Sequence, residues 1–288
     1  MLPSLFTGEH MAYKSILVHA DLSRHAPQRI AIAARLAHTH QAHLIGAAMT
    51  GVSRFTLENN RGMRGGAVVA QMSALHGHAQ QALEQFEQLA RQAGAVSLER
   101  RLIEDDEDDG MAVSARYSDL TVLSQHDASE ALPGAMRDLV PYVMLNAARP
   151  VLIVPRSGQF AQVDNTVVVA WDGSMEATRA IGHALPLLRA ARLVVLALLH
   201  PPAGHAQPAR HPGADIAAYL SRHGVQVEVR PSVTTGDIGA ALLAMAAEVH
   251  ADLLVMGGYG HARFREILLG GVTETVLRQM TLPVLMAH

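Results

Sequence analysis

Short aliphatic runs alternate along the chain with longer stretches whose apolar residues recur every three to four positions. Such runs are typical of buried strands, and the recurrence is typical of helices that pack on a sheet. In the first half, strands are predicted at residues 16–20, 44–49, 97–103, 120–124 and 151–154, and a long helix at 72–91.

The second half repeats this alternation. Its runs VVVAW and DLLVMGG are almost continuously apolar, as strands covered on both faces must be. Strands are expected near residues 166–171, 193–199, 225–230, 252–256 and 283–287, with helices near 174–189, 213–223, 237–250 and 271–280. Alternating strands and helices predict a parallel sheet whose crossover helices lie on both faces.

The two halves are related by an internal duplication. SILVHADLSRHAPQRIAIAARLA at 15–37 aligns with TVVVAWDGSMEATRAIGHALPLL at 166–188, which matches Asp21 to Asp172. The fold class is therefore α/β, with two tandem copies of a five-stranded, Rossmann-like parallel sheet. The predicted organisation is a disordered lead at 1–12, a first domain at 13–156, a polar linker at 157–165 and a second domain at 166–288.

Each copy ends on a strand that a proline precedes, Pro150 in the first copy and Pro283 in the second. Proline cannot donate to a sheet ladder, so these strands suit edge positions. Because edge strands expose unpaired backbone groups, we expect the two copies to pair with each other there, or two chains to form a homodimer.

Composition excludes several classes of protein. The chain has 49% hydrophobic and 17% charged residues, a net charge of -3, no basic stripe and no apolar run long enough to cross a bilayer, so neither a nucleic acid nor a membrane partner is expected. There is no cysteine, which fits a reducing compartment, and the cytoplasm is the expected location. The 17 histidines are scattered without metal-ligand spacing, so no metal site is assigned.

The segment GGYGHARFREILLGG at 257–271 places glycines at both ends of a loop that follows a predicted strand and precedes a predicted helix. Ligands of open α/β sheets bind at the carboxyl ends of strands, and amides at a helix start attract anions. The glycines therefore predict a phosphate-binding loop. The segment matches neither the P-loop motif nor the dinucleotide-binding motif.

The spacing of Gly257, Gly260 and Gly270 resembles the ATP-binding signature of universal stress proteins, and the duplicated chain resembles a tandem member of that family. The resemblance implies ATP, with Mg²⁺, as the ligand of the second copy. The implied binding residues are Ala170, Trp171, Asp172, Met256, Gly257, Gly260, Gly270, Gly271 and Val272. The family usually has Ser or Thr where this chain has Gly271, so one hydroxyl contact with phosphate is missing here, a loss of about 0.5–1.5 kcal/mol.

Structural alternatives accompany these assignments. Asp172 could only cap the helix that follows it, Gly270 and Gly271 could serve close packing, and Trp171 suits the end of a sheet. Arg263 and Arg265 could reach phosphates or remain solvated. The first copy reads LSQHDASEALPGAMRD at 123–138, without the glycine spacing, so ATP binding is not expected there.

No nucleophile–base pair or other catalytic motif appears, so catalysis beyond slow ATP hydrolysis is not expected. The sequence favours an ATP-binding stress protein that signals through conformation or assembly. A scaffold module without nucleotide is the alternative, and a sensor that uses the histidine-rich loop at 201–212 is a third interpretation. The acidic run EDDEDD at 104–109 could bind a divalent cation, but its last carboxylates suit the start of the next helix.

Overall fold

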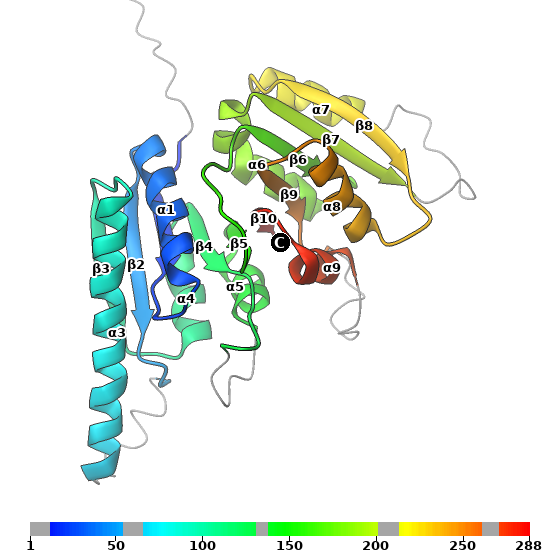
Figure 1. The fold of residues 1–288 in the computed structure, drawn as a ribbon. Coiled ribbons are helices and arrows are strands. Elements are labelled where there is room, and N and C mark those ends of the chain that lie inside the picture. The colour runs from blue at the N-terminus through cyan, green and yellow to red at the C-terminus, as the bar shows by residue number, and fades with distance from the viewer. Residues whose placement is uncertain (1–11, 54–65, 131–137, 201–212, 261–270) are drawn as a thin grey trace, which may run out of the picture.

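The computed structural model describes residues 12–53, 66–130, 138–200, 213–260 and 271–288, and of residues 66–68 and 200 only the backbone. A single ten-stranded sheet runs through it in the order β3-β2-β1-β4-β5-β10-β9-β6-β7-β8. Neighbouring strands are parallel within each half, and β5 and β10 meet antiparallel at the centre (Figure 1). The predicted fold class is confirmed.

The first copy contains five strands and four described helices. Their bounds are β1 (Ser15–His19), α1 (Ala26–His40), β2 (His43–Met49), α3 (Gly66–Gln92), β3 (Leu98–Ile103), α4 (Glu107–Ala115), β4 (Leu120–Ser124), α5 (Leu139–Ala147) and β5 (Val151–Val154).

The second copy repeats this order. Its bounds are β6 (Thr166–Ala170), α6 (Met175–Ala190), β7 (Leu193–His200), α7 (Ala214–Arg222), β8 (Val227–Val233), α8 (Ile238–Glu248), β9 (Leu253–Gly257), α9 (Val272–Gln279) and β10 (Val284–Ala287).

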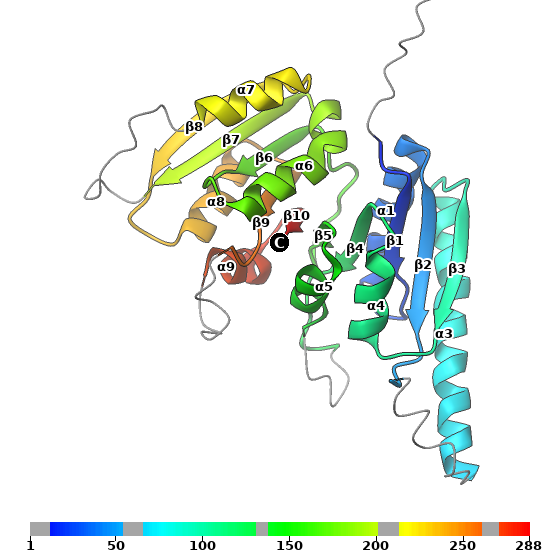
Figure 2. The same ribbon diagram turned by 180° about the vertical axis from the view of Figure 1, so that it is seen from behind.

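Helices cover both faces of the sheet, as Figures 1 and 2 show from opposite sides. Residues of α1, α3, α6 and α7 pack on one face, and residues of α4, α5, α8 and α9 on the other. Each apolar layer continues from one domain into the other. The two domains therefore share both cores.

Strands β5 and β10 form the junction. Val284 pairs with Ile153, Leu285 with Leu152 and Met286 with Val151. These side chains are fully buried, and successive residues enter opposite cores, as the period of a strand requires.

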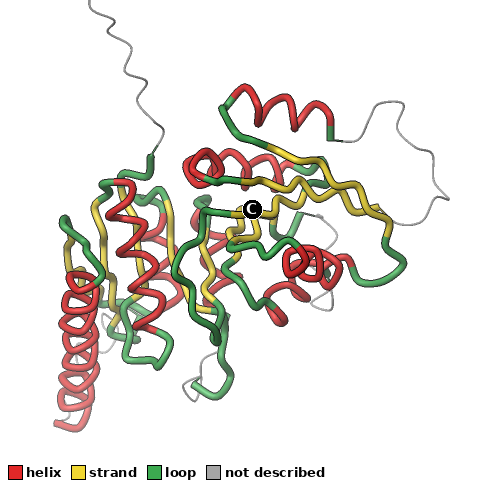
Figure 3. Tube along the Cα trace, turned by 45° about the horizontal axis from the view of Figure 1, so that its top comes forward, coloured by secondary structure: helices red, strands yellow, loops and turns green. Residues whose placement is uncertain are grey.

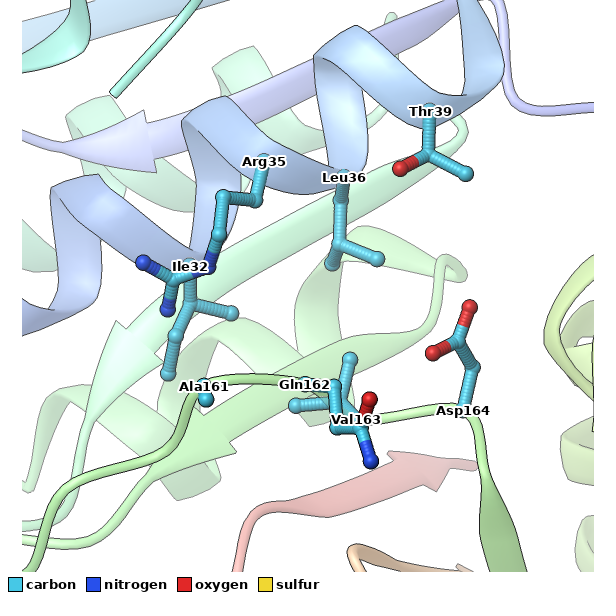
Figure 4. Close-up of a pocket in the computed structure, with 8 residues that line it drawn as sticks. All are labelled: Ile32, Arg35, Leu36, Thr39, Ala161, Gln162, Val163 and Asp164. Carbon is cyan, nitrogen blue, oxygen red and sulfur yellow. The ribbon is translucent and has the colours of Figure 1, made fainter. Parts of the chain in front are cut away.

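The linker lies along α1. The side-chain amide of Gln28 donates to the Gly158 carbonyl at 2.6 Å, a guanidinium N–H of Arg35 donates to the Phe160 carbonyl at 2.6 Å, and Val163 is buried. Between α1 and residues 161–164 lies a cavity of about 100 Å³, lined in part by Arg35 (Figure 4). Drug-sized ligands need about 300 Å³ or more, so this cavity is too small for a nucleotide.

Helix α3 is longer than the sequence pattern predicts. It begins at Gly66 instead of residue 72, and no side chain described between residues 69 and 78 is buried. A helix of 27 residues is about 40 Å long, whereas the six-residue strand β3 beside it spans about 20 Å. The first turns of α3 therefore extend past the sheet, as Figure 3 shows.

Candidate functional site

The predicted site lies where β6 and β9 end. These strands are parallel neighbours, with Val169 opposite Val255, so the segments that follow them leave the sheet at the same edge. Helix α6 begins after β6, and α9 begins after the loop that follows β9. The structure thus brings together the described parts of the two segments that the sequence singled out.

Asp172 is exposed just past β6. Its Oδ1 accepts a hydrogen bond from the Ser174 amide at 2.9 Å, and Ser174 in turn caps α6 by accepting from the Ala177 amide at 3.1 Å. The helix cap is therefore Ser174, and Asp172 only shapes the turn before it. Among the described residues no side chain engages Asp172 Oδ2, which leaves this oxygen for solvent or a ligand.

Trp171 and Ala170 support this turn from the strand end. The Trp171 amide donates to the Ala197 carbonyl of β7 at 3.0 Å, and its half-buried side chain packs against the core that contains α6. Ala170 is also half-buried and lies on the other face. Trp171 therefore has the sheet-end packing that the sequence suggested as an alternative to ligand contact.

The glycines at the end of β9 and just past it are crowded by protein atoms. A Cβ on Gly257 would lie 2.6 Å from the Ala177 amide nitrogen, and one on Gly260 would lie 2.9 Å from Glu176 Oε2. The first obstacle is rigid backbone, while the second is the end of a flexible side chain. Gly257 is thus required for α6 to approach β9, whereas Gly260 could tolerate a Cβ if Glu176 moved.

Two amides of the glycine loop are used inside the protein. Gly258 donates to the Ala287 carbonyl at 2.9 Å, and Tyr259 donates to Thr273 Oγ1 at 3.2 Å. Tyr259 has a φ of 56°, the left-handed region that non-glycine residues seldom adopt. The loop is therefore fixed to β10 and to the start of α9 up to Tyr259.

Helix α9 begins without a side-chain cap. Gly271 is its N-cap in extended conformation, with a φ of -128°, and Val272 is its first residue. The first amides of a helix have no partner within the helix, and here no side chain of the N-cap replaces one. The start of α9 as an anion site stays a prediction, and Gly270, Arg263 and Arg265 lie outside the described residues.

Carboxylates surround this region. Glu176 is buried in the first turn of α6, and the nearest described cation is a guanidinium nitrogen of Arg179 at 4.0 Å. Burial raises the pKa of Tyr259 to about 12, and the charges of Asp138 and Glu274 add to that shift. An anionic ligand here would therefore gain from an accompanying cation.

The equivalent place in the first copy holds a buried arginine. Arg29 is 2% exposed; its Nε donates to the His19 carbonyl at 2.9 Å, one terminal nitrogen donates to Ser124 Oγ at 2.7 Å, and the other lies 2.9 Å from Asp21 Oδ1. Ala180 occupies the position of Arg29 in the second copy. Asp21 is thus neutralised by a guanidinium, whereas no described cation pairs with Asp172.

The environment of Asp21 keeps it ionised. Burial opposes its charge, but Arg29, then His19 and the bonds from Ser23, outweigh burial and hold the pKa of Asp21 well below its usual range. The loop after β4 is fixed as well, since Asp127 pairs with Arg24 and with His25. These pairs tie the loop after β4 to the start of α1, in the copy that lacks the glycine motif.

Among the described residues, one group of three His and carboxylate side chains is close enough to share a metal ion. His19 is buried between two carboxylates, with Nδ1 3.4 Å from Asp21 Oδ2 and Nε2 3.1 Å from Glu107 Oε1. One of these carboxylates, that of Asp21, is also paired with Arg29.

The last residues of the acidic run at 104–109 form the start of α4, the placement that the sequence favoured over a cation site. Asp106 caps α4 by accepting from the Asp109 amide at 2.9 Å, and Glu107, Asp108 and Asp109 form the acidic first turn. The helix macrodipole stabilises negative charges at this end of a helix.

Sequence reasoning missed three residues, Arg29, Glu176 and Gln125. Arg29 and Glu176 lie in helical patterns where charged residues are normally solvated. Gln125 lies in a loop judged only by its lack of glycine. For Arg29 the one signal was its alignment with Ala180, since an arginine that replaces a core alanine needs a buried anion.

Comparisons with known proteins agree with this architecture. Residues 165–288 match the sequence model of the Universal stress protein family. A 66-residue segment is 35% identical to Universal stress protein Slr1230 of Synechocystis sp., a match that spans 23% of this chain and only 22% of that protein. The family match therefore covers the C-terminal domain of the chain.

Solved structures extend the likeness in fold to both domains. A universal stress protein from Archaeoglobus fulgidus superposes with a TM-score of 0.71 at 18% identity over 95% of each chain. A putative universal stress protein from Pseudomonas aeruginosa superposes with a TM-score of 0.57 at 18% identity, over 96% of this chain and 93% of that one. At this identity the likeness is one of fold.

Proposed function

We propose that the C-terminal domain binds ATP with Mg²⁺ and that the protein signals nucleotide occupancy through conformation or assembly. The observation that carries the proposal is the contrast between the copies: Asp172 is exposed without a described cation partner and α9 starts without a side-chain cap, whereas Arg29 neutralises Asp21. The proposed binding residues are Ala170, Trp171, Asp172, Met256, Gly257, Gly260, Gly270, Gly271 and Val272.

Asp172 and the first amides of α9 make the direct contacts with ATP in this proposal. Asp172 Oδ2 would accept a hydrogen bond from a ribose hydroxyl, and the first amides of α9 would donate to phosphate oxygens. Mg²⁺, when bound, would offset phosphate charge near Glu176. The first domain would not bind ATP, because it lacks the glycine spacing and its Asp21 is already paired with Arg29.

The rest of the proposal concerns the whole protein. We infer that the domains stay paired through β5 and β10, that any homodimer uses another surface, and that the protein acts in the cytoplasm. No described helix is long and apolar enough to cross a membrane. Any ATP hydrolysis would be slow, because the sequence contains no nucleophile–base pair or other catalytic motif.

A scaffold without nucleotide is the second candidate. It is favoured by the contacts of the glycines: a Cβ on Gly257 would meet rigid backbone, and a Cβ on Gly258 or Gly260 would meet a side chain, so packing contributes to the choice of glycine at all three positions. In that case the family signature persists here for structural reasons.

Nucleotide release and a thermal shift separate the candidates. We expect acid treatment of the purified chain to release adenine nucleotide, and MgATP to raise the melting temperature of nucleotide-free protein. Gly260→Ala should reduce that shift while keeping the fold, because Glu176 can move. Gly182→Ala is the matched control, since a Cβ there meets nothing within 4 Å. No released nucleotide together with no shift would favour the scaffold.

A further inference from the structure

Gln125 joins the first domain to the helix at which the nucleotide is proposed to bind. It is the first residue past β4, it is 5% exposed, and its amide donates to the Val154 carbonyl of β5 at 2.8 Å. This hydrogen bond ties the position of Gln125 to β5, the strand that pairs with β10.

The side chain of Gln125 satisfies the carboxyl end of α9. Its Nε2 donates to the Leu277 carbonyl at 2.8 Å and to the Arg278 carbonyl at 3.2 Å, while its Oε1 accepts from the Arg156 amide at 3.1 Å. The last carbonyls of a helix lack donors within the helix. A residue of the first domain thus donates hydrogen bonds to the last carbonyls of a helix in the second domain.

Helix α9 is short enough to act as one rigid element. It has eight residues, about two turns or 12 Å, and so short a helix is not stable without tertiary contacts. Gln125 holds its carboxyl end, and Thr275 holds its middle by donating to Asp237 Oδ2 at 3.0 Å. Its amino end, at Gly271, is the proposed phosphate site.

We propose that Gln125 is a positioning residue that couples nucleotide occupancy of the second domain to the domain junction through α9. The inference rests on the proposed function. Phosphate bound at the first turn and Gln125 bound at the last turn both favour the same ordered helix, so each strengthens the other. Because such coupling is reciprocal, ATP must also strengthen the contact of Gln125 with α9 and with Arg156.

The test compares the full chain with Gln125→Met, which keeps the side-chain length but removes the amide. Gln28→Ala is the control, because Gln28 also links the first domain to a backbone carbonyl, that of Gly158, away from α9. Titration calorimetry should show MgATP binding weakened about three- to tenfold by Gln125→Met. The control should stay within about twofold of the unmodified chain.

Hydrogen exchange of the unmodified chain supplies a second readout. MgATP should slow exchange at the Arg156 amide, which a purely structural Gln125 would not produce. An unchanged dissociation constant in folded Gln125→Met, or an Arg156 amide indifferent to MgATP in a chain that binds it, would overturn the coupling. Failure of the unmodified chain to bind MgATP is a separate result that removes the proposed function and the coupling together.

Discussion

Gln125 and Gly258 occupy equivalent positions in the two copies, each as the first residue past its strand. Their amides donate to equivalent carbonyls, that of Val154 at 2.8 Å and that of Ala287 at 2.9 Å. Gln125 extends to α9, whereas Gly258 leaves space for Met144 of α5, whose sulfur would lie 2.7 Å from a Cβ on Gly258. The junction is thus a near-symmetric contact with different chemistry on its two sides.

Gly258→Ala should destabilise the junction through Met144. The added methyl group must displace a flexible methionine, so we expect a loss of about 1–2 kcal/mol in the free energy of unfolding, within the usual range for overpacking. Urea denaturation followed by circular dichroism would measure it. In a Met144→Ala background the same change should cost less, since the methyl then enters a cavity; additive losses would show that the two residues are not coupled.

Asp21 should make the first domain sensitive to acid. Its pKa is lowered in the folded state, so its stabilising contribution is complete above the ordinary carboxyl pKa of about 3.9 and is lost as the pH falls through the folded value. At pH 7, Asp21→Asn should cost about 3 kcal/mol, the lower end for a broken buried pair, because it leaves Arg29 buried without its anion. Unfolding measured between pH 7 and pH 2 should show this difference shrink below pH 4.

The matched control for Asp21 is Asp172→Asn. Asp172 is exposed, and its Oδ1 bond to the Ser174 amide can be made by an asparagine oxygen. Its effect on stability should stay within about 0.5 kcal/mol at any of these pH values. Equal losses for the two variants would mean that Arg29 is not the reason for the acid sensitivity.

Glu176→Gln should change which form of ATP the second domain accepts. The Glu176 carboxylate lies beside Gly260, with only Arg179 at 4.0 Å as a described cation. Removing the charge should strengthen binding of ATP in EDTA by roughly tenfold, or ~1.4 kcal/mol, and binding of MgATP by much less. Calorimetry with and without Mg²⁺ measures both, and an equal gain for the two forms would place the phosphates away from Glu176.

The fold was predictable because its strands are continuous apolar runs and its two halves repeat each other. The pattern alone also located the ends of β6 and β9, where Asp172 and Gly257 stand. It could not show that Gly257 must be a glycine so that α6 can pack against β9, because these two elements are far apart in sequence. Arg29 escaped prediction for a similar reason: its burial depends on Asp21 and Ser124, which only the folded sheet brings together.

Gly271→Ser should restore the hydroxyl that this chain lacks at the start of α9. Gly271 has extended backbone angles that any residue can adopt, so serine fits without strain. As an N-cap it should stabilise the nucleotide-free protein by only a few tenths of a kcal/mol relative to glycine. If phosphate binds there, the hydroxyl should tighten MgATP binding about two- to tenfold, as one added hydrogen bond would.

Gly271→Ala distinguishes the effect of the serine hydroxyl on MgATP affinity from the effect of removing glycine. Alanine makes the same change in the backbone and offers no hydrogen bond, so it should leave MgATP affinity unchanged or slightly weaker. Fluorescence of Trp171, the single tryptophan, can follow both titrations from the other side of the site. Tighter binding by serine but not by alanine would locate phosphate at the first turn of α9. The same affinity for both variants would mean that the nucleotide, if bound, is held elsewhere.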